Sequence, residues 1–389
     1  MKVCGIIAEY DPFHRGHLYH LTRARALSEA DFVVCVLGTA FAQRGTPAYL
    51  STRARTEMAL KNGADAVFSL PVSFTMADAE RFAYGGVYLL NALQCVTHLS
   101  FGAETDDLPL LQRAAQCLET EPPELKAALL SGLQGGLSHA QARGRALERV
   151  LGASCERLFA PNNTLAVCYL RTLTRLSSPM IPLPVKRLGA YRGGADGFLS
   201  ATDIRALCEK RDFAALAAAL PAASYAIVQS ALQSGDFCPP DALDQALLYR
   251  LKTMDRAALR ALPGIGEGLE NRLMRLSPAA SSREELLGAL KTKRYTYARL
   301  SRCLCAALLG LKADHLPPAP GYARLLGFST RALPLLKRIK ASGFPLIAKN
   351  ADAREALAAD AFAESLWALG ARRPDTFYKE SPFINKTGE

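Results

Sequence analysis

The stretch Val3-Cys4-Gly5-Ile6-Ile7-Ala8-Glu9-Tyr10-Asp11-Pro12-Phe13-His14-Arg15-Gly16-His17-Leu18 decides the fold of the first half of the chain. Its apolar run over residues 3–8 predicts a buried parallel strand, which Asp11-Pro12 ends before a helix opens at His14-Arg15-Gly16-His17. A helix N-terminus after a strand and a tight turn is a natural phosphate site, because backbone N–H groups and the positive end of the helix dipole meet there. Two histidines and an arginine at this point suit a triphosphate and the charge that develops during nucleotidyl transfer.

Strand-like and helical patterns alternate up to about residue 205. We expect helices at 17–29, 51–62 and 78–93, and strands at 32–37, 66–70 and 96–101. Residues 106–151 read as helical, and a further strand at 181–187 precedes a glycine-rich loop at 189–197. This order predicts an α/β fold with a mostly parallel sheet, helices on both faces, and ligands at the carboxyl ends of the strands.

Beyond residue 210 the sequence contains few strand-like patterns, and alanine- and leucine-rich helical patterns dominate. We therefore expect an α/β domain over residues 1–210 and a mainly α-helical C-terminal domain over residues 211–389. One further strand is expected at 344–347. The polar tail after Pro374 is expected to be loosely ordered.

The 389 residues contain 47 Lys and Arg against 36 Asp and Glu, a net charge of +11. Such a balance favours a polyanionic partner, with RNA as the natural candidate. No apolar run approaches 18 residues and the N-terminus lacks the pattern of a signal peptide, so we expect a cytoplasmic protein with no membrane segment. The ten scattered cysteines form no Cys-x-x-Cys pair and are expected to be reduced and buried.

The histidines of the opening stretch allow other interpretations. They could cap the helix or lie on its surface, and His14, His17 and His20 have a spacing that zinc could use. No carboxylate or cysteine completes a zinc site, so the sequence predicts no bound metal. The position of His14 and His17 after a strand and a proline turn favours a catalytic role, whereas His20 is expected on the helix surface.

A second segment, Ser200-Ala201-Thr202-Asp203-Ile204-Arg205, gains meaning from the first. Alone it is a capped helix start. With His-x-Gly-His about 185 residues earlier, it is similar to the nucleotidylyltransferase superfamily, which includes the class I aminoacyl-tRNA synthetases. That similarity implies that hydroxyl and N–H groups here hold the β- and γ-phosphates, with Arg205 adding a charge-assisted fork.

A closer resemblance rests on motifs that run in order from residue 3 to about 310. They are residues 5–21, Phe41-Ala42-Gln43-Arg44-Gly45, Met58-Ala59-Leu60, Gly63-Ala64-Asp65, Phe82-Ala83, Phe101-Gly102, Pro161-Asn162-Asn163, Lys186-Arg187, residues 200–205 and Lys291-Thr292-Lys293-Arg294-Tyr295-Thr296. Together they resemble the bacterial tRNA(Met) cytidine acetate ligase family. The resemblance implies a Rossmann-like nucleotidyltransferase domain, acetate as a substrate and the wobble cytidine of elongator tRNA(Met) as acceptor, with N4-acetylcytidine as product.

The resemblance also implies an ATP site. Its expected residues are Ile7, Ala8, Glu9, Tyr10, Asp11, Pro12, Phe13, His14, Arg15, Gly16, His17, Leu18, Tyr19, His20, Gly102, Asn162, Arg187, Ser200 and Thr202. We expect His14 and His17 to donate to the α-phosphate as acetate attacks it. Arg205 is expected to hold the polyphosphate, with Lys186 or Arg187 as a further cation. Mg²⁺ is expected to accompany ATP, and Asp11 could serve either that ion or the ribose.

A basic segment is the expected contact for tRNA. Its cations, interleaved with Tyr295 and Tyr297, are Lys291, Lys293, Arg294, Arg299 and Arg302. Cations beside aromatic rings suit phosphate contact and base stacking, although a solvated helix start with inward-packed tyrosines is the simpler alternative. Leu262-Pro263-Gly264-Ile265-Gly266 has the form of a helix-hairpin-helix motif or of a plain interhelical turn. Gln43-Arg44-Gly45 is either a mobile surface loop or a lid or RNA contact near the acyl site.

Two other functions remain open on the residues alone. One is a nucleotidylyltransferase that adenylates a small phosphorylated metabolite, which the large basic second half disfavours. The other is an RNA-binding protein with a vestigial nucleotide site, which the two intact phosphate motifs disfavour.

Overall fold

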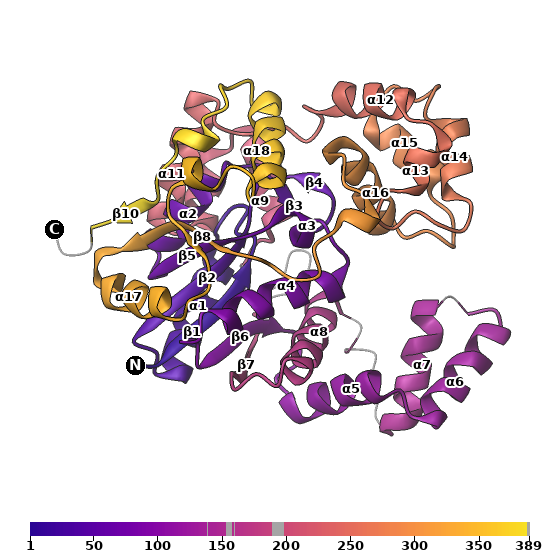
Figure 1. Ribbon diagram of the computed structural model, residues 1–389, viewed down its shortest axis with the longest axis horizontal. Coiled ribbons are helices and arrows are strands. Elements are labelled where there is room, and N and C mark those ends of the chain that lie inside the picture. The colour runs from indigo at the N-terminus through magenta and orange to yellow at the C-terminus, as the bar shows by residue number, and fades with distance from the viewer. Residues whose placement is uncertain (138, 153–157, 159, 189–197, 387–389) are drawn as a thin grey trace.

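The computed structural model describes residues 1–137, 139–152, 158, 160–188 and 198–386. Its centre is an eight-stranded sheet of order β10-β8-β5-β2-β1-β6-β7, with β9 beside β8 (Figure 1). The strands are β1 (Val3–Ala8), β2 (Phe32–Gly38), β5 (Ala66–Leu70), β6 (His98–Ala103), β7 (Ile181–Lys186), β8 (Ala323–Ser329), β9 (Leu346–Ile347) and β10 (Phe383–Asn385). Strands β5, β2, β1, β6 and β7 are parallel, and the predicted α/β fold is confirmed.

Successive side chains of β2 pack into different cores on the two faces of the sheet. Val34 and Val36 belong to one apolar cluster, and Val33 and Cys35 to another. The first cluster includes α4 (Ala79–Ala92), α5 (Leu108–Thr120), α8 (Pro161–Arg175) and α17 (Leu333–Ala341). The second includes α1 (Arg15–Ser28), α2 (Thr52–Lys61), α9 (Ala201–Lys210), α10 (Phe213–Ala219) and α11 (Ala222–Ser234). Burial on both faces is why these strands read as continuous apolar runs.

Two groups of helices project beyond the sheet (Figure 1). The helices α6 (Pro123–Gln134) and α7 (His139–Leu151) form one of them. The other, which we call the helical unit, consists of α12 (Asp244–Thr253), α13 (Arg256–Arg260), α14 (Leu269–Leu276), α15 (Arg283–Leu290) and α16 (Tyr297–Leu309). Its apolar core also takes in Trp367 of α18 (Ala358–Gly370) and Phe41 of the hairpin β3 (Phe41–Ala42)–β4 (Thr46–Pro47).

The second half of the chain contributes strands that the sequence analysis missed. β8 pairs antiparallel with β5, and β10 pairs parallel with β8. These strands place the last 60 or so residues beside the first half of the chain (Figure 1). The predicted domain boundary at residue 210 does not take account of them. The expectation of a loosely ordered tail was wrong, because Phe377 is buried and residues 383–385 form β10.

Other expectations concern cysteines, loops and membrane segments. Nine cysteines are free and buried, as predicted, while Cys155 and the glycine-rich loop at 189–197 lie outside the described residues. Within the described ranges, no helix has both the length and the apolarity to span a membrane.

Arg55 joins the ends of the strands that carry the site. This fully buried guanidinium of α2 donates to the carbonyl groups of Glu9 (2.9 Å), Gly38 (2.7 Å), Leu50 (3.0 Å) and Thr39. Burial lowers the pKa of Arg55 from its usual value, and nearby acidic groups oppose that shift. The Arg55 side chain therefore supplies the hydrogen-bond donors that water would otherwise give to the carbonyl groups at the carboxyl ends of β1 and β2.

Arg55→Met is expected to destabilise the protein by several kcal/mol, because each buried carbonyl left without a donor costs about 1–3 kcal/mol. Arg53→Met is the matched control. Arg53 is exposed on the same helix and donates to the carbonyl of Ser381, so its loss is expected to cost less than about 1 kcal/mol. Urea unfolding of both variants measures the difference, and equal losses would contradict the role assigned to Arg55.

Candidate functional site

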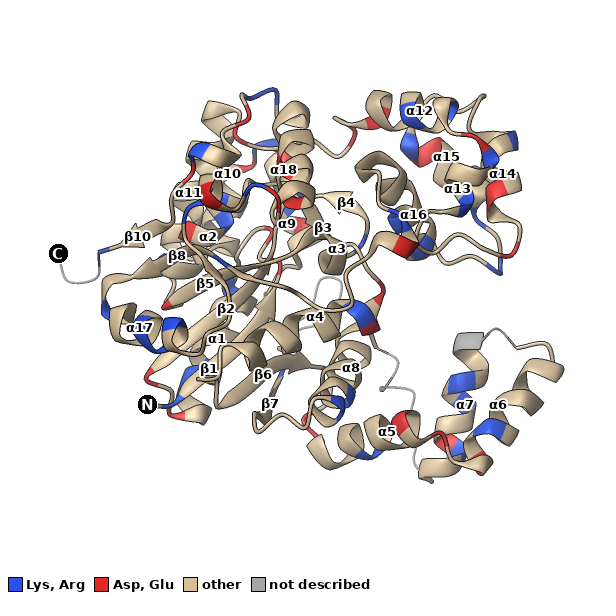
Figure 2. Ribbon diagram, in the orientation of Figure 1, with Lys and Arg blue, Asp and Glu red and all other residues tan. Residues whose placement is uncertain are grey.

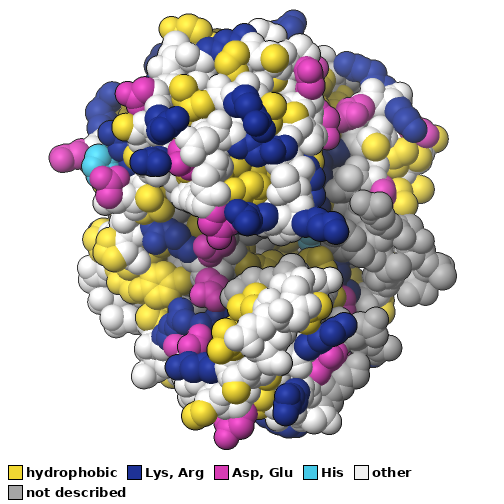
Figure 3. All heavy atoms as spheres, turned by 90° about the vertical axis from the view of Figure 1, so that its right-hand side faces the viewer, with side chains coloured by type: hydrophobic (Ala, Val, Ile, Leu, Met, Phe, Trp, Pro, Cys, Tyr) yellow, Lys and Arg dark blue, Asp and Glu magenta, His cyan; other side chains and the backbone are white. Residues whose placement is uncertain are grey.

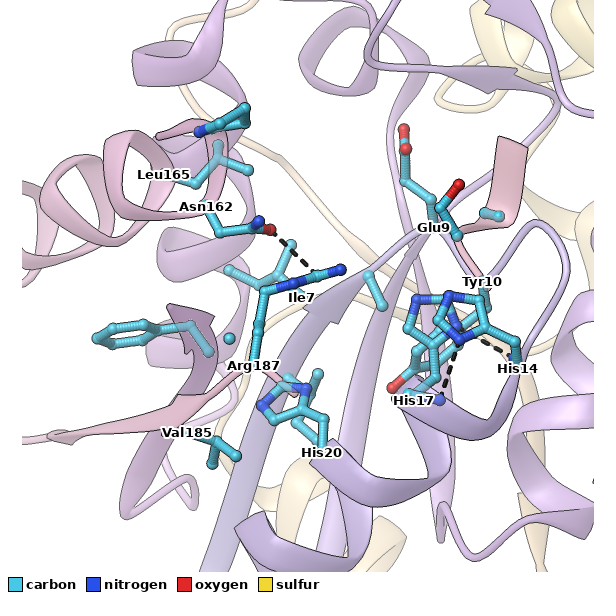
Figure 4. Close-up of a pocket in the computed structure, with 18 of the residues that line it drawn as sticks. Ile7, Glu9, Tyr10, His14, His17, His20, Asn162, Leu165, Val185 and Arg187 are labelled. Atoms are coloured by element: carbon cyan, nitrogen blue, oxygen red, sulfur yellow. Dashed lines mark hydrogen bonds between the residues drawn. The ribbon is translucent and has the colours of Figure 1, made fainter. Parts of the chain in front are cut away.

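The predicted ATP-site residues gather around one cavity at the carboxyl edge of the sheet (Figure 4). It has a volume of about 360 Å³ and opens between the N-terminus of α1, the N-terminus of α9 and the start of α8. The predicted residues that line it are Ile7, Ala8, Glu9, Tyr10, Asp11, His14, Gly16, His17, Tyr19, His20, Gly102, Asn162, Arg187, Ser200 and Arg205. Segments almost 200 residues apart in the sequence thus meet at one place.

His14 and His17 form the start of α1. The N–H of Gly16 donates to Nδ1 of His14 (3.0 Å), and the N–H of His14 donates to Nδ1 of His17 (3.3 Å). The two rings stack with centroids 3.7 Å apart. A Cβ at position 16 would lie 2.9 Å from Cε1 of His14, which explains the glycine between the histidines.

Both imidazoles are neutral. Burial, with smaller effects from Arg187 and Arg205, lowers the pKa of His14 to about 3. Burial also lowers the pKa of His17 well below its usual range. Because Nδ1 of each ring accepts a backbone hydrogen bond, the ring proton is assigned to Nε2. The two neutral rings therefore lie beside a helix N-terminus, and the His17 ring also hydrogen-bonds to the backbone of Pro12.

Asp11 and Arg205 hold the two phosphate segments together. The carboxylate of Asp11 accepts the N–H groups of Tyr49 (2.7 Å) and Leu50 (3.0 Å). Arg205 donates to the carbonyl of Asp11 (2.7 Å) and to the hydroxyl of Thr202 (3.2 Å). Both carboxylate oxygens of Asp11 therefore already accept backbone N–H groups. A contact between Asp11 and Mg²⁺ or the ribose stays a prediction.

Arg187 and Asn162 lie across the cavity from the stacked histidines (Figure 4). Arg187 donates to Oδ1 of Asn162 (3.4 Å), whose amide nitrogen donates to Glu104 (2.6 Å). A Cβ on Gly102 would come within 3.5 Å of the Arg187 side chain, so β6 passes close behind it. The three residues that the resemblance assigned to ATP are therefore neighbours.

Several predicted residues do not line the cavity. Phe13 is buried against Tyr10, and Arg15 donates to the carbonyl of Ala218 (2.7 Å). The others are Pro12, Leu18 and Thr202. Ser200 lines the cavity, but its hydroxyl caps α9 by accepting the N–H of Asp203 (3.2 Å), and it also donates to the Asp203 carboxylate (2.6 Å).

His20 corrects one expectation: it lies in the cavity instead of on the helix surface, and it hydrogen-bonds to the hydroxyl of Ser100 (3.0 Å). The sequence analysis also missed an apolar wall made of Ala79, Phe82, Leu165 and Tyr169. In the sequence these residues belong to the apolar faces of α4 and α8. An apolar helix face normally indicates packing in the protein core, not a ligand site.

A metal site has little support from the side chains. The described residues contain no group of three or more His, Cys, Asp or Glu side chains that could hold a metal ion. Among the described residues that line the cavity, the acids are Glu9 and Asp11, and both carboxylate oxygens of Asp11 already accept backbone N–H groups. Mg²⁺ usually binds through one or two carboxylates together with substrate phosphates. The residues do not fit a dedicated Mg²⁺ site.

The basic segment lies on the helical unit, where Lys and Arg are frequent (Figure 2). Lys293 and Arg294 are exposed and line a hollow of about 780 Å³ with Arg272 and Arg275. Figure 3 shows basic side chains on both sides of the furrow that crosses this face of the molecule.

The other side chains predicted to contact tRNA are less accessible to a ligand. Lys291 donates to the carbonyl groups of Thr292 and Tyr295, and Arg299 donates to that of Gly264 (2.9 Å). Burial lowers the pKa of Arg302. Tyr295 is buried and donates to the carbonyl of Glu267 (2.8 Å), which contradicts its predicted stacking role.

Residues 262–266 lie in the turn between α13 and α14. The carbonyl of Gly264 accepts from Arg299, and that of Pro263 accepts from the thiol of Cys303 on α16. These bonds direct the turn towards α16, as expected of an interhelical turn.

The comparisons with known proteins agree with this geometry. The model of the HIGH nucleotidyl transferase family matches residues 1–380. The tRNA(Met) cytidine acetate ligases of Clostridium kluyveri and Acetivibrio thermocellus are 38% and 37% identical to this chain, each over 90% of it and over 90% and 89% of their own length. The chain belongs to the tRNA(Met) cytidine acetate ligase family.

Solved structures show the same fold. Thermotoga maritima TmcAL bound with alpha-thio ATP is 29% identical, covers 100% of both chains and has a TM-score of 0.92. The apo form of that protein is 30% identical over 100% of both chains, with a TM-score of 0.93.

The buried histidines predict a pH dependence of stability. Burial also lowers the pKa of His20 to about 4, so the folded chain keeps all three rings neutral at pH 5. The unfolded chain protonates them below about pH 6.5 and thus binds more protons, so the free energy of unfolding falls as the pH drops. For His14 alone the loss between pH 8 and pH 5 is about 2 kcal/mol.

Urea unfolding at the two pH values checks this. His14→Gln is expected to lose its share of the pH dependence, whereas His315→Gln, at an exposed position, is expected to retain all of it. An unchanged pH dependence in His14→Gln would contradict the neutral, buried state.

Proposed function

We propose that this protein is an ATP-dependent ligase that activates acetate as acetyl-adenylate and transfers the acetyl group to the wobble cytidine of elongator tRNA(Met), forming N4-acetylcytidine. The observation that carries the proposal is the hydrogen bond from Arg205 to the carbonyl of Asp11, which joins the two phosphate motifs in one cavity. Membership of a family whose members bear that name supports the substrates.

The first half-reaction uses the groups around α1. An acetate oxygen attacks the α-phosphorus of ATP, and pyrophosphate leaves with the electron pair of the broken bond. The Nε2–H groups of His14 and His17 donate to the charge that grows on the phosphate oxygens, and Arg205 holds the departing polyphosphate. A preorganised donor of this kind is typically worth about 3 kcal/mol in the transition state.

Arg187 and Asn162 are proposed to bind the nucleoside side of ATP. They sit on the β6–β7 side of the cavity, across from the histidines (Figure 4). Neutral imidazoles suit this site, because their donor capacity does not change between pH 5 and pH 9. Any Mg²⁺ would arrive on the triphosphate, and no step depends on a protein carboxylate that holds it.

The tRNA is proposed to bind the helical unit, with Lys293 and Arg294 contacting phosphates. Their hollow also contains Arg272 and Arg275, so four cations surround one concave surface. Such clusters supply most of the sequence-independent affinity for nucleic acid.

Isotope exchange between pyrophosphate and ATP tests the proposal. Exchange that requires acetate is the expected result. Exchange that ignores acetate but requires another small substrate would contradict it, as would tight tRNA binding without any exchange.

His14→Ala and His17→Ala are each expected to lower acetate-dependent exchange by about 10²–10³-fold, because a transition-state donor is removed. The affinity for tRNA, measured by filter binding, is expected to stay unchanged. Equal loss of exchange and of tRNA binding would mean that these residues maintain the fold.

Lys293→Glu combined with Arg294→Glu is expected to weaken tRNA binding and to lower the slope of log K against log salt by about 1–2, while exchange stays unchanged. Lys337→Glu combined with Lys340→Glu, on the exposed side of α17, is the matched control and should leave both quantities intact. An unchanged salt slope in the first variant would place the RNA surface elsewhere.

A further inference from the structure

Glu9 follows β1 directly and reaches the cavity on the side of His14 and His17, across from Arg187 and Asn162 (Figure 4). In the sheet, β1 has β6 on one side and β2 on the other. If ATP occupies the β6–β7 side through Arg187 and Asn162, the side towards β2 is left for the groups that react with the α-phosphate and with the acyl carbon. Glu9 is the acidic side chain at that position.

A backbone hydrogen bond fixes one carboxylate oxygen of Glu9. Its Oε1 accepts the backbone N–H of Gln43 at 2.6 Å, and the Gln43 side chain in turn donates to the carbonyl of Ala77 (3.2 Å). Within the described residues, Oε2 receives no hydrogen bond and no Lys or Arg forms an ion pair with Glu9. One oxygen is therefore anchored while the other is available to a ligand.

The anchor is not a mobile loop. The hydroxyl of Ser301 on α16 lies 2.6 Å from the carbonyl oxygen of Arg44 and 2.8 Å from that of Gly45, and Arg283 donates to the latter (2.7 Å). Gly45 has φ +80°, and a Cβ there would lie 2.5 Å from the backbone nitrogen of Arg302. The β3–β4 hairpin is thus packed on the helix that carries part of the basic segment.

The second half-reaction needs a proton acceptor. The lone pair of the exocyclic amine of cytidine is delocalised into the ring, so this amine is a weak nucleophile that must lose a proton as the new C–N bond forms. General bases typically accelerate such steps by about 10²–10⁴-fold.

Other candidate bases in the cavity are already engaged. Nδ1 of His14 and of His17 accepts a backbone N–H. His20 bonds to Ser100 through Nε2 and lies beside Arg187, away from Glu9 (Figure 4). The carboxylate of Asp11 accepts two backbone N–H groups. Among the titratable side chains of the described cavity wall, Glu9 therefore offers the available acceptor oxygen.

We propose, on the basis of the proposed function, that Glu9 is the general base for acetyl transfer, with its Oε2 accepting a proton from the cytidine amine. The amine nitrogen attacks the carbonyl carbon of acetyl-adenylate and forms the C–N bond. The bond between that carbon and the phosphate oxygen breaks, and AMP leaves with the electron pair. The proton passes to Glu9, so atoms and charge balance.

The surroundings of Glu9 suit this task. Burial raises the pKa of Glu9 above its ordinary value, while the hydrogen bond from Gln43 opposes that shift. The charged groups that face it are Asp11 on the same segment, Arg55 of α2 and Arg44 of the hairpin. A carboxylate that is more basic than one on the surface takes a proton more readily.

The test separates the two half-reactions. Glu9→Gln keeps the size of the side chain and removes the base. Single-turnover transfer from chemically prepared acetyl-adenylate to a tRNA(Met) transcript is expected to fall by about 10²–10⁴-fold. Acetate-dependent exchange of pyrophosphate is expected to fall much less, although Glu9 also lines the ATP cavity. The wild-type transfer rate should rise with pH to a plateau, and the variant should lose that inflection.

Two further variants complete the experiment. Glu57→Gln makes the same change on α2, at a half-buried carboxylate that pairs with Lys61. It is the control and should match the wild type in both assays. Ser301→Ala keeps Glu9 but removes a contact that fixes the hairpin, so transfer should fall while exchange persists. If Glu9→Gln transfers the acetyl group at the wild-type rate, or loses exchange and transfer equally, Glu9 is not the general base. If the wild-type enzyme shows no acetate-dependent exchange, the proposed function itself is wrong.

Discussion

Three segments that lie far apart in the sequence meet at Asp11. Its carboxylate accepts hydrogen bonds from Tyr49 and Leu50, and its carbonyl accepts one from Arg205. A buried carboxylate is costly unless its oxygens are satisfied, and here backbone N–H groups satisfy both. Because the segment between β1 and α1 is held in this way, the N-termini of α1 and α9 open onto the same cavity.

The sheet order gives that cavity two sides with different chemistry. Arg187 and Asn162 belong to the β6–β7 side, and Glu9 with the β3–β4 hairpin belongs to the side towards β2. The stacked histidines stand at the helix N-terminus. In the proposed reaction, acetate first attacks the α-phosphorus and the cytidine amine then attacks the acyl carbon. Two successive partners must therefore approach neighbouring atoms, which such a division allows. The hairpin also connects the Glu9 side of the cavity to the helical unit, through Ser301.

Much of the fold was predictable because its strands are buried on both faces. The ranges of β1 and β5 coincide with the predicted runs, and Ser200 caps its helix as the sequence pattern indicates. β8 was missed because it lies among helical segments, and Arg324 within it interrupts the apolar pattern although it is buried. It pairs with β5 from the first half of the chain, for example Arg324 with Ser69, and such long-range pairings leave no local signal.

The site was predictable where motifs are local and not where contacts are long-range. His14, Gly16 and His17 are recognisable from their spacing, and the pairing with Arg205 followed from the similarity to the nucleotidylyltransferase superfamily. The packing of Gly45 against α16 and the hydrogen bond from Gln43 to Glu9 depend on the tertiary fold. His20 lines the cavity because Ser100 of β6 lies beside it, which helix periodicity alone does not reveal.

A crystal structure of the protein with ATP tests the central claim most directly. The account predicts that the triphosphate lies at the N-terminus of α1, between the imidazoles of His14 and His17 and the guanidinium of Arg205. A nucleotide bound elsewhere, for example in the groove that α7 and α8 line beside Glu80, would contradict it.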